Sequence, residues 1–195
     1  MLYFGSFNPI HKGHVALAEY VLEQGLCDLV TLIVSPQSPY KSEHELAPAL
    51  DRFEMAELAC AASRYPEQIK PSVVEMLLPK PSYTIDTLRY LEQVSGGSMQ
   101  FSILMGADQI DGLTGWREWQ EIVKYPIWIY PRAGEQNGLE ALPAPTMQLL
   151  GDAPLHVVSA TEIRRRIAAG EDCSQLIHPK VAWHIRTKGL YKKVE

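Results

Sequence analysis

GSFNPIHKGH, residues 5–14, is the stretch that decides the fold of this chain. Apolar residues 1–4 precede it and predict a buried strand, although such a strand normally has about five residues. A glycine and a proline inside the stretch favour a tight turn after that strand. Apolar residues then recur at helical spacing over residues 13–23. We therefore expect a strand, a turn and a helix, with a first strand that is either short or begins upstream of the first residue.

His11 and His14 lie at the start of this predicted helix. The first N–H groups of a helix have no partner within it and attract anions, so imidazoles beside them suit a polyphosphate. Gly5 and Gly13 let a nucleotide approach the backbone closely. Two other interpretations fit the histidine pair alone: ordinary surface or capping histidines, and a metal site, for which no further ligands are evident nearby. The preceding turn favours phosphate binding.

SATEIR, residues 159–164, is a second motif of the phosphate-binding type near the other end of the chain. Ser159 or Thr161 is suited to cap a helix whose N–H groups then face a ligand. Arg164 follows at a spacing from which its guanidinium can contact two phosphate oxygens. The alternative is a plain helix start with a solvated arginine. We expect Arg165 and Arg166 to be surface residues.

Apolar runs alternate with helical patterns along the whole chain. The expected strands are residues 1–4, 29–34, 70–74, 99–105, 127–130 and 156–158, and the expected helices are residues 13–23, 48–62, 84–94, 116–123, 161–169 and 179–187. This alternation predicts an α/β fold, a doubly wound, Rossmann-like parallel sheet with helices on both faces and a small helical C-terminal part. We expect one domain over residues 1–195, with surface loops at residues 36–47 and 132–145.

Ligands of such sheets bind beyond the carboxyl ends of the strands, near the point where the strand order reverses. The turn after the first strand, Ser35-Pro36, Gly106-Ala107-Asp108 and Ser159-Ala160 all follow predicted strands, so they should converge on one edge. Lys41, in the loop after the second strand, is a candidate for the β- and γ-phosphates. His44 and Arg52 are weaker candidates of the same kind.

A second subsite is suggested by PSYT, residues 81–84, together with Trp116. Tyr83 and Trp116 offer flat apolar faces, and the N–H of Thr84 lies at a predicted helix start that can receive a carboxylate. Asp108 can accept hydrogen bonds from a ribose or an amide. The alternatives are a helix cap at Ser82, packing aromatic residues and a second cap at Asp108.

Bulk composition excludes several classes of protein. The net charge of −5 disfavours a broad nucleic-acid-binding surface. Three widely spaced cysteines without a CxxC pair indicate a reducing compartment rather than a disulfide framework or a cysteine-rich zinc site. The longest strongly apolar run, residues 29–34, is far shorter than the roughly 18 residues of a membrane span, and no basic-then-apolar leader precedes the first motif. We expect a cytoplasmic protein, and an oligomer is compatible with the sequence.

GSFNPIHKGH and SATEIR together resemble the HxGH nucleotidyltransferase superfamily. PSYT, residues 81–84, the stretch MGAD, residues 105–108, Trp116 with Trp119, and GLY, residues 189–191, narrow the resemblance to the bacterial nicotinate-nucleotide adenylyltransferases. The resemblance runs nearly from end to end. The chain differs from the family in two places. Its first strand is short, and it has Tyr40-Lys41 where the family often has histidine or phenylalanine beside a basic residue.

The resemblance implies adenylyl transfer from ATP to nicotinate mononucleotide, with Mg²⁺ carried by the phosphates. Implied catalytic residues are His14, His11 and Arg164. The ATP site would comprise Gly5, Ser6, Phe7, His11, Gly13, His14, Lys41, Ser159, Thr161 and Arg164. The mononucleotide site would comprise Tyr83, Thr84, Gly106, Asp108 and Trp116, and no protein metal ligand is implied. Alternatives are transfer to another acceptor, such as nicotinamide mononucleotide or phosphopantetheine, and a nucleotide-binding module without catalysis.

Overall fold

The computed structural model describes residues 1–37, 46–131, 142–154 and 159–192. Six strands form one parallel sheet: β1 (Leu2–Gly5), β2 (Val30–Val34), β3 (Ile69–Ser72), β4 (Ile103–Gly106), β5 (Ile127–Tyr130) and β6 (Met147–Leu149). Their order is β3-β2-β1-β4-β5-β6. The order reverses between β1 and β4, so the two strands that precede the GSFNP turn and the Gly106-Ala107-Asp108 segment are neighbours. This is the doubly wound arrangement that the alternation of patterns predicted.

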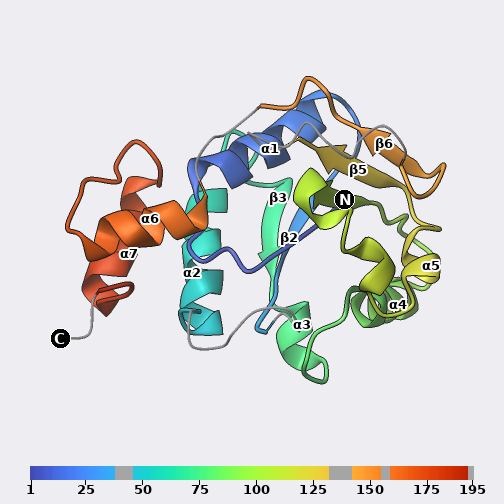
Figure 1. Cartoon of the computed structure of the whole chain (residues 1–195), viewed down its shortest axis with the longest axis horizontal. Helices are drawn as coiled ribbons and strands as arrows, with labels where there is room; N and C mark the ends of the chain where they lie inside the picture. The colour runs from blue at the N-terminus through green and yellow to red at the C-terminus, as the bar shows by residue number, and fades with distance from the viewer. Residues whose placement is uncertain (38–45, 132–141, 155–158, 193–195) are drawn as a thin grey trace.

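The helices are α1 (Lys12–Glu23), α2 (Ala49–Cys60), α3 (Val74–Leu77), α4 (Thr84–Ser95), α5 (Trp119–Ile122), α6 (Ala160–Ala168) and α7 (Pro179–Lys188). Two 3₁₀ turns, η2 (Ala107–Gln109) and η3 (Leu113–Gly115), follow β4. Figure 1 shows the sheet in the middle, α4 and α5 at one end and the C-terminal helices α6 and α7 beyond α2 at the other. Of the helices in the described residues, none has the length and apolar character needed to cross a bilayer.

Alternating strand residues bury two separate cores. In β2, Leu32 and Val34 face the core that contains α1, α2 and the C-terminal helices. Ile33, between them, faces the other core, which contains α4 and α5. Both faces of the sheet are therefore covered, and this explains why residues 29–34 read as a continuous apolar run rather than as an alternating one.

Several sequence-based expectations about elements are wrong. The strand expected at residues 99–105 begins only at Ile103, and Val74, expected to end a strand, is instead the first residue of α3. The helix expected at residues 116–123 begins only at Trp119, because Glu118 has a left-handed backbone (φ 50°) that interrupts it. The N-cap of α4 is Tyr83 rather than Ser82, which is buried. Strand β6 was not expected, because only the first of its three residues is buried. The strand expected at residues 156–158 lies outside the described residues.

Candidate nucleotide-binding site

The turn between β1 and α1 is shaped by the ring of Phe7. This ring packs edge-to-face against Tyr3 and His14, with centroid distances of 5.5 and 5.1 Å. A Cβ on Gly5 would lie 3.0 Å from the Phe7 ring, so glycine is required here by the packing of the turn itself. Phe7 is 2% exposed and has a left-handed backbone (φ 45°). Only its main chain is therefore placed to contact a ligand.

His11 and His14 lie side by side at the start of α1. Their rings are stacked, with centroids 3.6 Å apart. His14 Nδ1 accepts a hydrogen bond from the backbone N–H of His11 at 3.1 Å. In the neutral ring the proton must then be on Nε2, which makes Nε2 a donor suited to a phosphate oxygen. Gly13 is the second residue of the same helix, between the two imidazoles in sequence.

The two ends of the chain meet at this turn. Arg164 Nη1 donates to the carbonyl oxygen of Asn8 at 2.9 Å, which joins the SATEIR helix to the GSFNP turn. The buried Asn8 side chain accepts two further hydrogen bonds through Oδ1, from the N–H of Ala47 at 3.0 Å and from the hydroxyl of Tyr191 at 2.8 Å. Asn8 and Tyr191 were not among the expected site residues, since only the tertiary fold brings them together.

The start of α6 has the predicted capping arrangement. Ser159 Oγ accepts a hydrogen bond from the N–H of Glu162 at 3.2 Å. Thr161 Oγ1 instead accepts from Arg164 Nη2 at 3.3 Å and helps to orient the guanidinium. Arg165 and Arg166 both pair with Glu162 and lower the pKa of its carboxyl to about 2. Arg164 is thus directed to the turn, whereas its two neighbours form exposed ion pairs.

Arg52, one of the weaker candidates for a phosphate ligand, instead binds carbonyl groups of the protein itself. Its side chain is fully buried and donates to four carbonyl oxygens, those of Ser6, Ser35, Pro36 and Ala47. Arg52 therefore links α2 by hydrogen bonds to the segments that follow β1 and β2. Lys41 and His44 lie outside the described residues.

The residues of the expected second subsite follow β4 and begin α4. Tyr83 and Trp116 are half-buried and pack against the same core. Thr84 is the first residue of α4, while Gly106 ends β4 and the exposed Asp108 lies within η2. Because Asp108 is inside a 3₁₀ turn rather than before it, the expected alternative of a cap does not hold.

Two polar features beside these residues were missed from the sequence. The hydroxyls of Tyr3 and Tyr130 lie 3.1 Å apart across β1 and β5, on either side of β4. The carboxyl of Glu75 is buried and accepts a hydrogen bond from Thr87 Oγ1 at 3.0 Å, and burial raises its pKa. No spacing rule marks either feature, since each depends on which strands and helices become neighbours.

Within the described part of the chain, three or more metal-ligating side chains come together only at Asp51, Glu54 and His184. His184 Nε2 lies 3.1 Å from Asp51 and its Nδ1 lies 3.7 Å from Glu54, while Lys188 also pairs with Asp51. Each ring nitrogen thus faces a different carboxylate. These contacts, with the ion pair between Lys188 and Asp51, join α2 to α7.

Residues 2–166 match the family described as cytidylyltransferase-like, and the chain belongs to that family. Its relatives include probable nicotinate-nucleotide adenylyltransferases. That of Flavobacterium johnsoniae is 36% identical over 194 residues, 98% of both chains. That of Bacteroides fragilis is 37% identical over 181 residues, 92% of this chain and 87% of the relative. Within the family, the chain is a member of the nicotinate-nucleotide adenylyltransferases.

Solved structures share the fold. Nicotinic acid mononucleotide adenylyltransferase of Plasmodium falciparum, complexed with NaAD, superposes with a TM-score of 0.83 over 97% of this chain and 95% of its own, at 20% identity. The same enzyme complexed with APC gives a TM-score of 0.81 at 19% identity. At these identities the similarity concerns the arrangement of the sheet and helices.

Proposed function

We propose that this chain transfers the adenylyl group of ATP to nicotinate mononucleotide, forming deamido-NAD and pyrophosphate. The observation that carries the proposal is the hydrogen bond between Arg164 and the Asn8 carbonyl, which joins the two phosphate-type motifs at one place. The names of the relatives that match the chain over nearly its full length support the same reaction.

The triphosphate would lie between the start of α1 and the start of α6. His14 would contact the α-phosphate and the bridging oxygen, and His11 would help to hold the triphosphate. Arg164, with Lys41 from the loop after β2, would bind the β- and γ-phosphates. Main-chain atoms of the turn and of Gly13, together with Ser159 and Thr161 at the α6 start, would complete the ATP site, where helix dipoles favour anions.

The chemistry requires no general base from the protein. The attacking group is the 5′-phosphate of the mononucleotide, whose second pKa near ~6 leaves it largely dianionic at neutral pH. One of its oxygens forms a bond to the α-phosphorus of ATP while the bond from that phosphorus to the pyrophosphate oxygen breaks. What remains for the protein is to orient two anions and to stabilise the charge that grows on pyrophosphate, which imidazole, guanidinium and backbone donors can do.

Mg²⁺ would accompany ATP on its phosphates. Imidazole N–H and guanidinium groups are donors, whereas Mg²⁺ prefers oxygen ligands, so the donor set at this site fits the phosphates rather than the ion. The ion would neutralise part of the phosphate charge. The histidines and Arg164 would then position the remaining oxygens.

The mononucleotide would lie beyond β4, beside the start of α4. Tyr83 and Trp116 would pack against the pyridine ring, and the N–H of Thr84 would receive its carboxylate. Gly106 would allow close approach of the backbone, and Asp108 would accept hydrogen bonds from the ribose. These placements use the neighbouring carboxyl ends of β1 and β4.

An acceptor screen tests the proposal. Purified protein with ATP and Mg²⁺ is offered nicotinate mononucleotide, nicotinamide mononucleotide or phosphopantetheine, and pyrophosphate release is measured while the dinucleotide product is identified by mass. We expect the highest kcat/KM with nicotinate mononucleotide. Higher values with another acceptor would assign a different transferase activity, and no turnover with any acceptor would reduce the chain to a nucleotide-binding module.

A further inference from the structure

Arg117 places a positive charge at the start of α4. Its guanidinium carbon lies 5.0 Å from the centroid of the Tyr83 ring. Its Nη1 donates to Asp86 Oδ2, in the first turn of α4, at 3.2 Å. Arg117 itself comes from the segment between η3 and α5, and its side chain is half exposed. Arg117 was not among the residues expected at the site.

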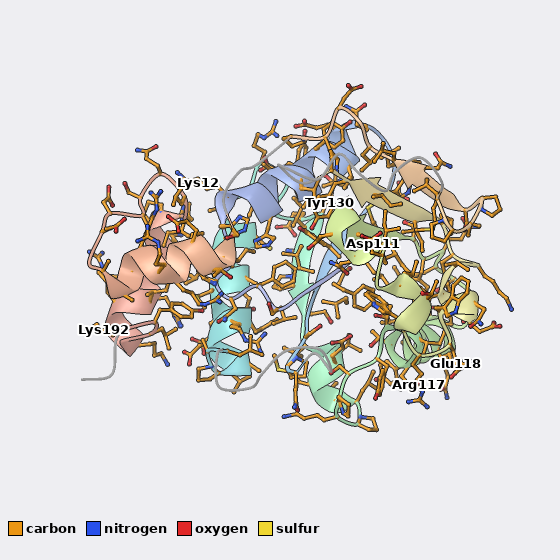
Figure 2. All side chains as sticks on the ribbon, viewed as in Figure 1. Lys12, Asp111, Arg117, Glu118, Tyr130 and Lys192 are labelled. Atoms are coloured by element: carbon orange, nitrogen blue, oxygen red, sulfur yellow. The ribbon has the colours of Figure 1, made fainter. Side chains whose placement is uncertain are left out.

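The backbone next to Arg117 is held in an unusual conformation. Glu118 is in the left-handed region, which is uncommon for a residue other than glycine. Both carboxylate oxygens of Glu118 accept hydrogen bonds from Arg89 of α4, at 3.1 and 2.6 Å. Figure 2 shows Arg117 and Glu118 next to each other beside α4. The bidentate pair ties this turn to α4, so the direction in which Arg117 leaves the backbone is fixed.

A cation at the start of a helix is electrostatically unfavourable by itself, because the helix N-terminus already carries partial positive charge. Two carboxylates offset that charge, because Arg117 Nη1 lies 3.2 Å from Asp86 Oδ2 and Arg117 Nε lies 3.8 Å from Glu118 Oε1. The guanidinium still lies over the Tyr83 ring at the start of α4, and a guanidinium, an aromatic ring and helix N–H groups together suit a planar ring that carries a carboxylate.

We propose that Arg117 is a specificity-determining residue that contacts the pyridine carboxylate of the acceptor. This inference rests on the proposed function. Guanidinium N–H groups donate to both carboxylate oxygens of nicotinate mononucleotide. The amide of nicotinamide mononucleotide presents one acceptor and an NH₂ group, and arginine has no acceptor to offer that NH₂. Arg117 thus favours the acid and disfavours the amide.

The competing interpretation is a set of surface ion pairs that Arg117 forms with Asp86 and Glu118. Exposed pairs of this kind contribute little to stability or activity. Under that interpretation, replacing Arg117 leaves the preference for acid over amide unchanged.

The test compares Arg117→Gln and Arg117→Lys with the unmodified protein, using both mononucleotides at saturating ATP and Mg²⁺. We expect Arg117→Gln to lower the ratio of kcat/KM for the acid over the amide by about tenfold or more, the cost of one charge-assisted hydrogen bond. The loss should appear in KM for nicotinate mononucleotide, with kcat and the KM for ATP little changed. Arg117→Lys should restore part of the ratio.

Lys124→Gln is the matched control, since Lys124, just after α5, also belongs to an exposed ion pair, in its case with Glu121. Thermal melting of each variant checks that the fold is retained, and calorimetric titration with each mononucleotide gives a readout without turnover. An unchanged ratio in Arg117→Gln, an equal loss in Lys124→Gln, or an unmodified protein that does not discriminate would overturn the inference. An unmodified protein inactive with both mononucleotides would instead overturn the proposed function.

Discussion

At the scale of single residues, His14 has the most narrowly defined role in the proposed chemistry, because it must donate a hydrogen bond from one particular ring nitrogen. The hydrogen bond from the His11 N–H to Nδ1 directs the proton of the neutral ring to Nε2. Stacking on His11 and the edge contact with Phe7 fix the plane of the ring. A donor that is oriented before substrate arrives stabilises a transition state without reorganisation.

Replacing His14 by alanine should therefore slow turnover strongly. We expect kcat to fall by roughly 10²–10³, as for the loss of one preoriented donor, while the KM for nicotinate mononucleotide changes little. Steady-state pyrophosphate release measures the effect, and a circular-dichroism melt of the variant confirms folding. Near-normal kcat in a folded variant would remove His14 from the mechanism.

Cys60 gives a prediction that does not involve the site. Burial raises the pKa of its thiol to about 12, so almost no thiolate forms at neutral pH. We expect Cys60 to resist iodoacetamide in the native protein and to react once the chain is unfolded in guanidinium, as read by mass spectrometry of peptides. Native labelling of Cys60 at the rate of a free cysteine would show that α2 is not packed as described.

At the scale of elements, α2 holds the segments that follow β1 and β2. The guanidinium N–H groups of Arg52 donate to backbone carbonyl oxygens, and burial lowers the pKa of this guanidinium. From the sequence, Arg52 was only a weak candidate for a phosphate ligand, because an arginine can either bind a phosphate or bind buried carbonyl groups. Its position on the buried face of α2, which shows that it binds carbonyl groups, is known only from the fold.

Arg52→Met should destabilise the protein, because several buried carbonyl oxygens lose their donor. We expect the free energy of unfolding in urea to fall by about 2–5 kcal/mol. The control is Arg64→Met, which removes an exposed arginine that pairs with Glu19 and Glu23 and should lower the free energy of unfolding much less, because exposed ion pairs contribute little. Equal losses in the two variants would contradict the role assigned to Arg52.

The buried carboxyl of Glu75, in α3, should make the stability of the protein depend on pH. Burial raises the pKa of this carboxyl above the ordinary value of 4.5, and the side-chain hydroxyl groups of Ser35, Thr87 and Ser82 offset only part of this. The unfolded chain therefore releases this proton at a lower pH than the folded protein does. The stability that protonated Glu75 contributes is complete below the ordinary pKa and is lost as pH rises through the folded-state pKa.

Glu75→Gln removes this titration. Compared with the variant, the unmodified protein should lose stability as pH rises above the ordinary carboxyl pKa of 4.5, measured as the free energy of urea unfolding at each pH. A difference between the two proteins that stays constant, or that moves in favour of the unmodified protein at high pH, contradicts the assignment.

The elements also show what the sequence can and cannot predict. Strands β1, β2 and β5 were predicted at nearly their observed positions, because buried parallel strands are apolar throughout. Strand β4 was predicted to begin four residues too early. Strand β6 is short and mostly exposed, so no hydrophobic pattern marks it. The late start of α5 follows from the backbone of Glu118, which its residue type does not predict.

At the scale of the whole molecule, the strand order places the site. The reversal between β1 and β4 lies between the GSFNP turn and the segment after Gly106. Arg164 and Asn8, which belong to the two phosphate-type motifs, are 156 residues apart in the sequence but are joined by a hydrogen bond. The positions of His14 in α1 and of Arg164 in α6 were predictable, because helix starts and the spacing after them are local features of the sequence. Arg117, Arg52 and Asn8 were not, because their partners belong to distant segments.

Co-crystallisation with a non-hydrolysable ATP analogue and Mg²⁺ tests the central claim most directly. The account predicts electron density for the triphosphate at the start of α1, in contact with His14 on one side and Arg164 on the other. An analogue bound at full occupancy with its phosphates touching neither side chain would contradict it.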